Sequence, residues 1–343
     1  MGITPIIGQP GIQSGNTVTY RQVFRQPESV LYFPGGGTID KASQDYGNDD
    51  PLTLRGGLLM GRVTSGKKWR PSLMGKMITA ALTSVGTSIT VSVATAKELV
   101  RRVGTSGTFK LTGPTAANGT ARTVTITYSA VDTTTGVITI TAAGVNEVQT
   151  LNWTNAPAGT FRLRIKDSSG VLQSTQRITY SATIGTLLAN LQAATDAVLA
   201  TNAIVWSGSV VTAVAATFSG TGYAALPQEF IIVDTDGLTA GDVDVTRTTT
   251  GVDGRFVVGS FLQPTDGSEA PVSVIPSGSG IQMVTANAAD VDFPQIPYSG
   301  IFDSAQIVDW PSDTGLQAWI VSQLTAAGQG RFSFSHLMSP LGT

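Results

Sequence analysis

The 343-residue chain contains no cysteine and a single histidine. Without thiols it can form neither a disulfide nor a thiolate site, and one histidine leaves too few nitrogen ligands for the usual zinc centres. Charged residues make up 13% of the chain, against a usual value of about 25%. The net charge is −2, so the sequence has no excess of basic residues that would attract nucleic acids or anionic membranes. We therefore expect no nucleic-acid and no membrane partner.

Long apolar runs are also absent. No run approaches the roughly 20 residues needed to span a bilayer. The first residues, MGITPIIGQPGIQ, have neither the charged region nor the continuous apolar core of a secretory signal. Ile6 stands where a myristoylation signal has Ser or Thr. We expect a soluble chain made in a cytoplasm.

The sequence is instead rich in Thr, Val, Ala, Gly and Ser, the residues of strands and tight turns. Residues 122–131, RTVTITYSAV, alternate apolar and polar side chains as a half-buried strand does. Three segments have helical periodicity instead: 95–103, 183–200 and 314–328. These patterns predict a mainly β protein with short helices, of the α+β class.

Composition and turn signals divide the chain into four parts. Residues 1–50 are turn-rich and hold no periodic pattern, which predicts an extended N-terminal arm. Residues 51–75 and 255–343 are predicted to form one body. Residues 76–143 are predicted to be an inserted α+β unit, and residues 144–254 a second inserted unit of β-β-β-α-β-β-β order.

The arm nevertheless carries a strongly apolar stretch, TYRQVFRQPESVLYF, which an unstructured linker would not be expected to have. One interpretation is that the arm adds a strand to another protein, with apolar anchors. The alternative is that it folds back on its own body. The first interpretation predicts that deleting residues 1–40 leaves the body folded. Its candidate anchors are Tyr20, Val23, Phe24, Leu31, Tyr32 and Phe33.

Residues 61–68, GRVTSGKK, come close to the phosphate-binding pattern G-x-x-x-x-G-K-[ST]. The final position is Lys68, which offers no hydroxyl to Mg²⁺, and Pro71 discourages the helix that must follow. Apolar positions before Thr64-Ser65-Gly66 and a return segment from Lys67 favour a β-hairpin instead.

Catalytic patterns are missing as well. The chain has no G-x-S-x-G elbow. Acidic pairs such as Asp234/Asp236 and Asp242/Asp244 lie in turn-like sequence without the spacing of a calcium loop. A calcium site elsewhere and a glycoside hydrolase built on two carboxylates are the remaining alternatives. We expect a protein that is not an enzyme and that uses no cofactor or metal.

The segment LTLRGGLLMGRVTSGKKWRP resembles a strand module of tailed-phage head decoration proteins, the family of the lambda head protein. The resemblance rests on Leu54, Gly57, Met60, Gly61, Val63, Thr64, Ser65, Gly66, Lys67 and Trp69. PTDGSEAPVSVIPSG and SGIFDSAQIVDWPSDTGLQAWIVSQLTAAG are similar to later blocks of the same family. The run from NEVQTLNWT to VDVTRTTTG, residues 146–251, resembles a module that recurs in phage structural proteins.

The resemblance implies a small β-barrel or β-tulip body split by the inserted region. It also implies a homotrimer that binds the phage major capsid protein on the outside of the virion and stabilises the shell. Candidate oligomer or capsid contacts are Trp69, Trp310, Phe332 and Phe334. The alternative function is a head-fibre or tail-associated adhesion protein that binds carbohydrate. Its candidate ligand-reading residues are Trp153, Trp206 and Tyr223, which the opposing interpretation makes ordinary core aromatics.

Overall fold

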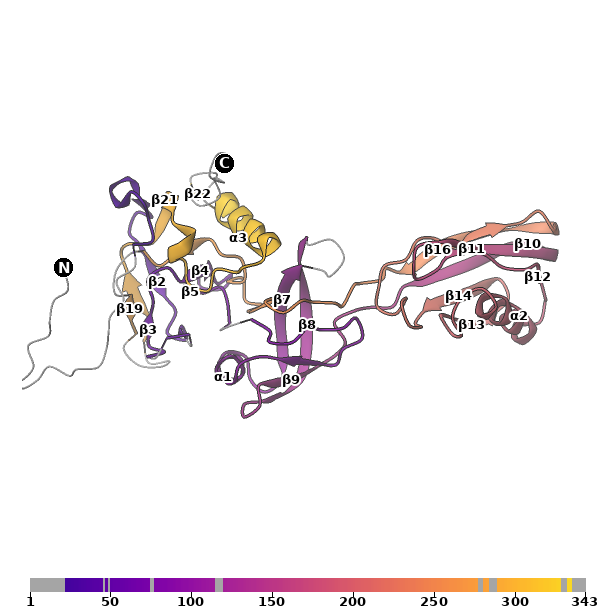
Figure 1. The fold of residues 1–343 in the computed structure, drawn as a ribbon, viewed down its shortest axis with the longest axis horizontal. Coiled ribbons are helices and arrows are strands. Elements are labelled where there is room, and N and C mark those ends of the chain that lie inside the picture. The colour runs from indigo at the N-terminus through magenta and orange to yellow at the C-terminus, as the bar shows by residue number, and fades with distance from the viewer. Residues whose placement is uncertain are drawn as a thin grey trace, which may run out of the picture. The chain divides into compact units, whose positions relative to one another are not determined.

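The computed structural model describes residues 22–45, 47–48, 50–74, 77–114, 120–276, 280–283, 289–327 and 332–334. Strands account for 40% of the chain and helices for 14%, so the prediction of a mainly β fold with short helices is confirmed (Figure 1). The chain divides into two compact units. Unit 1 comprises Met1–Ser72, Asp266–Trp310 and Ile320–Thr343, and unit 2 comprises Leu73–Thr265 and Pro311–Trp319. No helix within the described ranges is long and apolar enough to cross a membrane.

Unit 1 is built from short strands that come from both ends of the sequence. Its five-stranded sheet has the order β18-β4-β5-β2-β20, a second sheet has the order β1-β21-β22, and β19 pairs with β3. The elements are η1 (Pro27–Ser29), β1 (Leu31–Tyr32), β2 (Gly37–Ile39), β3 (Thr53–Leu54), β4 (Leu59–Arg62), β5 (Trp69–Pro71), β18 (Ser273–Val274), β19 (Ile281–Gln282), β20 (Val291–Phe293), β21 (Pro297–Phe302), η2 (Ser304–Gln306) and β22 (Phe332–Phe334). Helix α3 (Thr314–Ala327) contributes to both units.

The segment GRVTSGKK forms a β-hairpin, as predicted. Met60 pairs with Pro71 and Arg62 with Trp69, and the turn uses the left-handed conformation at Gly66 and Lys67. Gly61 is required for a different reason, because a Cβ there would collide with the backbone of Ser268. The absent side chain therefore lets β4 lie directly against the returning C-terminal segment.

Unit 2 contains two apolar cores, and the first lies beneath a five-stranded antiparallel sheet of order β17-β7-β8-β9-β6. Its elements are β6 (Ser88–Thr90), α1 (Val93–Arg102), β7 (Gly107–Pro114), β8 (Ala121–Asp132), β9 (Val137–Ile140) and β17 (Phe261–Gln263). The Ser92 hydroxyl caps α1 by accepting the Thr95 N–H at 3.1 Å. The buried Tyr128 hydroxyl donates to Gly104 O at 2.8 Å, and burial raises the Tyr128 pKa to about 12.

The second core is organised by one long strand, β10 (Val148–Lys166), to which five other strands pair. The sequence predicted two strands here, 148–154 and 159–167. The chain instead stays paired through a bulge where Asn155 and Gly159 have positive φ. The rings of Trp153 and Phe161 meet edge to face at 4.8 Å, so the strand bends sharply at this bulge. The paired strands are β11 (Leu172–Ser174), β12 (Ile178–Thr179), β14 (Ala213–Phe218), β15 (Ile232–Asp234) and β16 (Leu238–Thr249).

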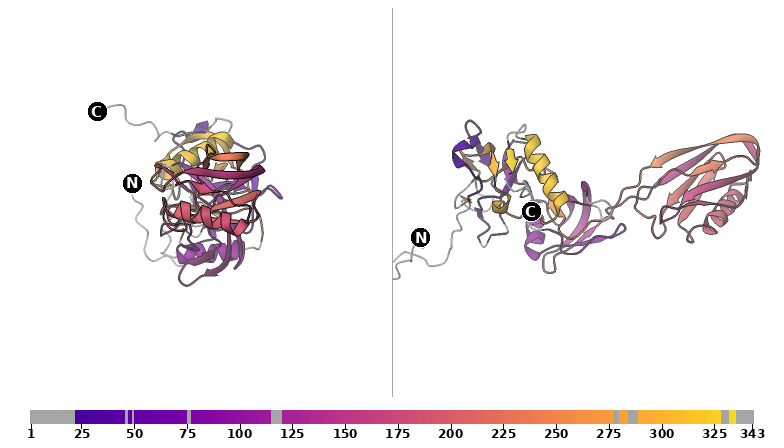
Figure 2. Two further views of the ribbon diagram at one scale, coloured as in Figure 1. Left: turned by 90° about the vertical axis from the view of Figure 1, so that its right-hand side faces the viewer. Right: turned by 45° about the horizontal axis from the view of Figure 1, so that its top comes forward.

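Helix α2 (Ile184–Asp196) covers this second core. Leu187, Leu191 and Thr195 are buried at helical spacing, and Figures 1 and 2 show the helix beside β13 (Ile204–Val210) and β14. Residues 203–215, predicted as one strand, form the β13–β14 hairpin. Residues 225–234, also predicted as a strand, pair only at Ile232–Asp234, because the preceding part is held by side chains instead of by a strand ladder.

The buried Glu147 carboxylate holds that preceding part. Its oxygens accept hydrogen bonds from Gln149 Nε2 at 2.6 Å, Arg247 Nε at 2.9 Å and the Gln228 N–H at 2.8 Å. Gln149 in turn accepts the Ile231 N–H at 2.8 Å. A fully buried carboxylate requires such partners, and together they fix residues 226–231 against β10 and β16.

Two predicted boundaries change. Residues 22–45 are not a free arm, because they form η1, β1 and β2 of unit 1. The predicted insertions 76–143 and 144–254 have separate cores but group into one unit. An antiparallel bridge between Val145 and Val252 joins the two halves, with N–H to O distances of 3.0 and 2.9 Å.

Candidate functional site

The N-terminal segment enters unit 1 through two buried anchors. Val23 is 0% exposed and Phe24 1%. The Phe24 ring lies 4.9 Å from the ring of Phe302, and the Asp303 N–H donates to Val23 O at 2.9 Å. Both residues were predicted as capsid-binding anchors, and their burial excludes that role. Their position agrees with the alternative interpretation, in which the arm folds back on its own body, because both residues contact the Phe302–Asp303 segment of the same chain.

The residues that follow are partly open to solvent. Leu31 is 50% exposed, and β1, which contains it, is a terminal strand of its sheet that pairs only with β21 among the described residues. Tyr32 is half-buried. The ring of Phe33 packs between Trp69 at 5.7 Å and Tyr298 at 5.2 Å. Leu31 and Tyr32 therefore stay available as surface contacts, whereas Phe33 belongs partly to the core. Tyr20 lies outside the described residues.

Trp69, predicted as an oligomer or capsid contact, lies in the core of unit 1. It is 4% exposed and packs with Ile39, Met60 and other apolar residues. A Cβ at Gly37 would collide with its ring, so the indole is enclosed by the chain itself. Its burial excludes the predicted contact role.

The other three predicted contacts lie near the C-terminal end. Trp310 is half-buried in unit 1. Phe332 and Phe334 lie in β22, which pairs in parallel with β21, and their side chains lie outside the described part of the structure. For these residues the contact role remains a prediction.

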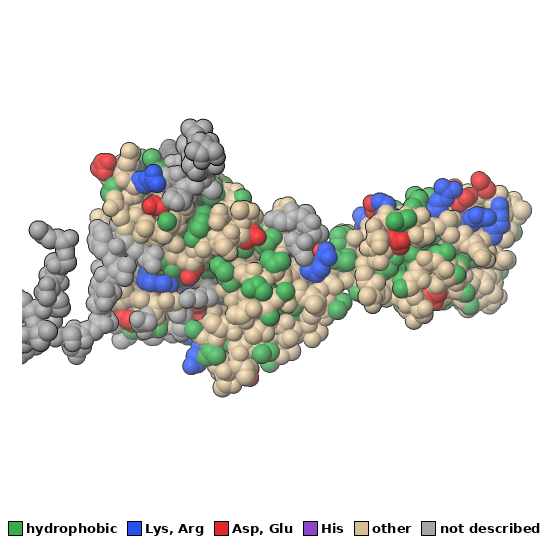
Figure 3. Space-filling view, in the orientation of Figure 1, with side chains coloured by type: hydrophobic (Ala, Val, Ile, Leu, Met, Phe, Trp, Pro, Cys, Tyr) green, Lys and Arg blue, Asp and Glu red, His purple; other side chains and the backbone are tan. Residues whose placement is uncertain are grey.

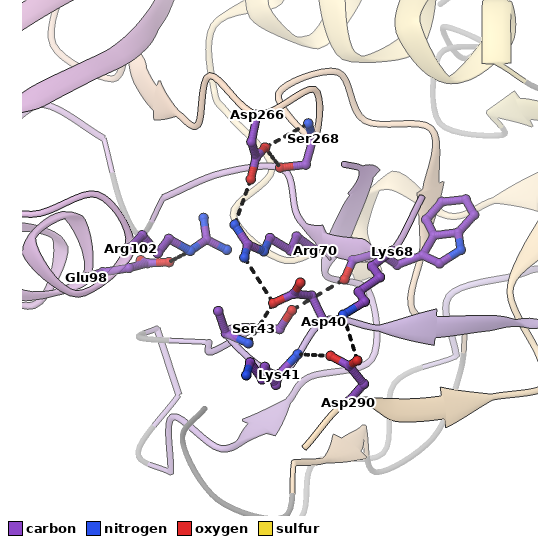
Figure 4. A network of polar contacts seen from close by, with 12 residues as sticks. Asp40, Lys41, Ser43, Lys68, Arg70, Glu98, Arg102, Asp266, Ser268 and Asp290 are labelled. Carbon is purple, nitrogen blue, oxygen red and sulfur yellow. Dashed lines mark hydrogen bonds and ion pairs between the residues drawn. The ribbon is translucent and has the colours of Figure 1, made fainter. Parts of the chain in front are cut away.

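A cluster of charged residues, here called the polar clamp, joins three regions of unit 1 (Figure 4). Arg70 on β5 is its centre. Arg70 Nη2 lies 3.0 Å from Asp40 Oδ1 and Arg70 Nη1 lies 2.7 Å from Asp266 Oδ2. Lys68 Nζ lies 2.7 Å from Asp290 Oδ2. The polar clamp (Asp40, Lys68, Arg70, Asp266 and Asp290) thus ties the hairpin to residues near both ends of the chain.

The outer pair of the clamp shifts both of its pKa values. The hydrogen bond with Asp290 raises the pKa of Lys68, although partial desolvation opposes the rise. The same bond, with the Lys41 N–H at 2.9 Å, lowers the pKa of Asp290. Both directions favour the charged pair at neutral pH. Lys68 and Asp290 therefore form a structural ion pair.

The three predicted ligand-reading residues are buried in the second core of unit 2. Trp153 is 4% exposed, Trp206 6% and Tyr223 2%. Trp206 Nε1 donates to the Thr195 hydroxyl at 3.2 Å, and Trp153 meets the rings of Phe161 and Tyr180 edge to face. A sugar platform requires an exposed ring face, so these residues cannot fill that role in this conformation. They are core aromatics.

Sequence reasoning did not find the polar clamp. Asp40, Arg70 and Asp266 are far apart along the chain, and single charges in turn-like sequence are expected to be solvated. The close approach of Gly61 to Ser268 was not expected either. The recurring glycines of the hairpin motif are the sequence feature that could have indicated this close backbone contact.

Among the described residues, no group of three or more acidic or histidine side chains could hold a metal ion. Neither a protein-family model nor a curated protein matches the chain. The described part of the site has an exposed apolar residue, Leu31, on a terminal strand and the ion pairs of the polar clamp.

Proposed function

We propose that this protein is a structural component of a tailed-phage virion that binds the outer surface of the capsid as a trimer and stabilises the shell. The carrying observation is Leu31, which is 50% exposed on a terminal strand that starts a few residues after the buried anchor Phe24. An exposed strand edge with an apolar side chain can accept a strand from a capsid subunit, where main-chain bonds supply affinity and side chains supply specificity.

The organisation of the chain supports this proposal. Unit 1 is assembled from both ends of the sequence, and the segments that carry the family resemblance lie mostly within it. Charged side chains are sparse among uncharged ones on the face drawn in Figure 3. Binding to a repeated shell requires complementary surface on each copy rather than a catalytic group, and several joined copies gain avidity.

The burial of Phe24 changes how the proposal is tested. Deleting residues 1–40 would remove all of β1 and β2, so the truncated body would not stay intact as the sequence suggested. The appropriate truncation removes residues 1–21 only. We expect it to keep the fold and to weaken capsid binding, because Tyr20 and its neighbours are lost.

The point test uses two leucines of equal exposure. Purified protein is mixed with undecorated capsids and pelleted, and its mass in solution is measured by light scattering. Leu31→Asp should reduce co-pelleting strongly. Leu172→Asp, at a position 49% exposed in unit 2, should leave it unchanged. Wild-type protein that stays in the supernatant with intact capsids would refute the proposed function.

A further inference from the structure

Strand β16 is twelve residues long and has one open side. Within the described residues it pairs only with β10. Most of its side chains are exposed, and it contains neither proline nor lysine, two residues that proteins use to block strand edges. A long edge of this kind is a template for a further strand.

The hydrogen-bond alternation identifies the outward-facing groups. The Trp153 N–H donates to Thr212 O at 2.9 Å, on the β14 side of β10. Thr150 and Asn152 therefore face β16, where they pair with Thr246 and Asp244. It follows that the N–H and C=O groups of Val243, Val245 and Arg247 point away from β10. The Val243 N–H donates to the Asp242 carboxylate at 2.8 Å. The other two N–H groups face outward, and neither has such a bond within the described part of the chain.

The opposite margin of the same sheet is closed. Strand β13 pairs only with β14 among the described residues, but a side chain of α2 takes the place of a neighbouring strand. Gln192 Nε2 donates to Ile204 O at 2.9 Å, and Gln192 Oε1 accepts the Trp206 N–H at 3.3 Å. One edge is thus capped by an amide that imitates a peptide group, and the other is left open.

We propose that β16 is a self-association edge, which pairs antiparallel with β16 of a second copy of this chain. The regular part of the edge ends at Arg247, because the pairing with β10 shifts between Gln149 and Val148. Only a register centred on Val245 brings the outward-facing backbone groups of all three residues, Val243, Val245 and Arg247, into the new strand pair. Val245 then meets its own copy, and Val243 meets Arg247 of the second strand.

Charge favours the same register. Crossing at Val245 places Asp244 opposite Thr246, so each carboxylate faces a hydroxyl donor. Crossing one residue earlier would place the two Asp244 carboxylates opposite each other, which destabilises a strand pair. In this register the N–H groups of Val245 and Arg247 donate to the second strand. The Val243 N–H can keep its hydrogen bond to the Asp242 carboxylate. Such a pairing is isologous, so it closes as a dimer instead of growing into a fibre.

The test places opposite charges at one exposed position. Thr246→Lys loses the hydrogen bond that Asn152 Nδ2 donates to the Thr246 hydroxyl at 3.0 Å, whereas the carboxylate introduced by Thr246→Asp can still accept it. The stability of each variant is therefore first compared with that of the wild type at low concentration, where the chain does not associate. Sedimentation equilibrium of the full chain, from micromolar to near-millimolar concentration, gives the dissociation constant. We expect Thr246→Asp to weaken association by about tenfold or more and Thr246→Lys to tighten it by about fivefold, since each change acts twice per dimer.

Two results would overturn the proposal. One is a wild-type mass that does not rise with concentration, which would leave the edge to a strand of another protein. The other is an equal response of the two variants, which would show that Asp244 does not face residue 246. This inference can fail without the proposed function failing. Trimerisation under the proposed function involves unit 1 and should persist in both variants, so only the part of the association that differs between the two variants reports pairing of β16.

Hydrogen exchange gives a second measurement without substitution. The amides of Asp244 and Thr246 bond to β10 and should be protected at every concentration. The amides of Val245 and Arg247 should gain protection only as the copies associate. Unchanged exchange of these two amides in a concentrated, associated sample would contradict the β16 pairing.

Discussion

The two units of this protein reach stability by different means. Among the described residues of unit 1 the longest strand has six residues, and pairs such as Ser273 with Met60 join segments that are distant in the sequence. In unit 2, β10 alone has 19 residues, and several neighbouring strands are sequential hairpins. Unit 1 packs an apolar cluster around Trp69, and its short strands are also joined by the ion pairs of the polar clamp. Unit 2 has two large apolar cores and a buried polar network around Glu147.

The largest expected effect tests whether unit 2 also depends on a polar contact. Glu147→Ala leaves the donors on Gln149 and Arg247 without their buried acceptor, and it should lower the free energy of unfolding by about 3–5 kcal/mol. Urea unfolding measures the loss, and hydrogen exchange of residues 226–231 locates it. The control is Glu229→Ala, which removes an ion pair with Lys166. The Glu229 side chain is 69% exposed, so this variant should change the free energy of unfolding little. Equal effects of the two variants would show that the buried network is dispensable.

The next prediction concerns the close packing of unit 1. Gly61→Ala inserts a Cβ into the backbone of Ser268 and should cost about 1–3 kcal/mol through overpacking. Gly66→Ala is the control, because its Cβ would meet nothing within 4 Å and only the positive φ is penalised, by about 1 kcal/mol. Hydrogen exchange should show the Gly61 effect in β4 and β18. A smaller loss at Gly61 than at Gly66 would contradict this account of the hairpin.

The polar clamp should contribute less. Arg70→Met removes two ion pairs at a side chain that is 21% exposed, with an expected loss of about 1–2 kcal/mol after screening by solvent is considered. Lys68→Met removes one pair at a more exposed side chain and should have the smaller effect. High salt should reduce the difference between the variants. If Lys68→Met were the more damaging change, Arg70 would not be the centre of the clamp.

The smallest effect appears only at alkaline pH. The folded-state pKa of Tyr128 is about 12, above its ordinary value of 10.0, so the folded state holds the phenol proton more tightly than the unfolded state. Stability is complete below about pH 10 and falls as the pH rises toward about 12. Burial also raises the pKa values of Tyr180 and Tyr223, so Tyr128→Phe should reduce this dependence without abolishing it, which unfolding measured at several alkaline pH values would detect. A pH profile identical to that of the wild type would mean that another group titrates.

The polar residues that fasten the fold could not have been predicted from the sequence. Asp40, Arg70 and Asp266 meet only because strands from both ends of the chain share one sheet, and nothing local marks them. The same reason applies to Val23 and Phe24. Their apolar character predicted a contact, but which surface they contact depends on where β21 lies. For Trp153, Trp206 and Tyr223, composition allowed either a platform or a core, and burial in the second core decided between them.

By itself the sequence determined the elements whose signal is local. The alternation over residues 122–131 and the turn residues of GRVTSGKK specify strands and a hairpin, because side-chain period and left-handed turn positions act over a few residues. The periodicity of residues 183–200 specifies a helix for the same reason. The bend in β10, the Glu147 network, the Gln192 cap on β13 and the open edge of β16 were decided by the tertiary structure alone. Each depends on which strands become neighbours, and that is set by the sum of long-range contacts rather than by any one segment.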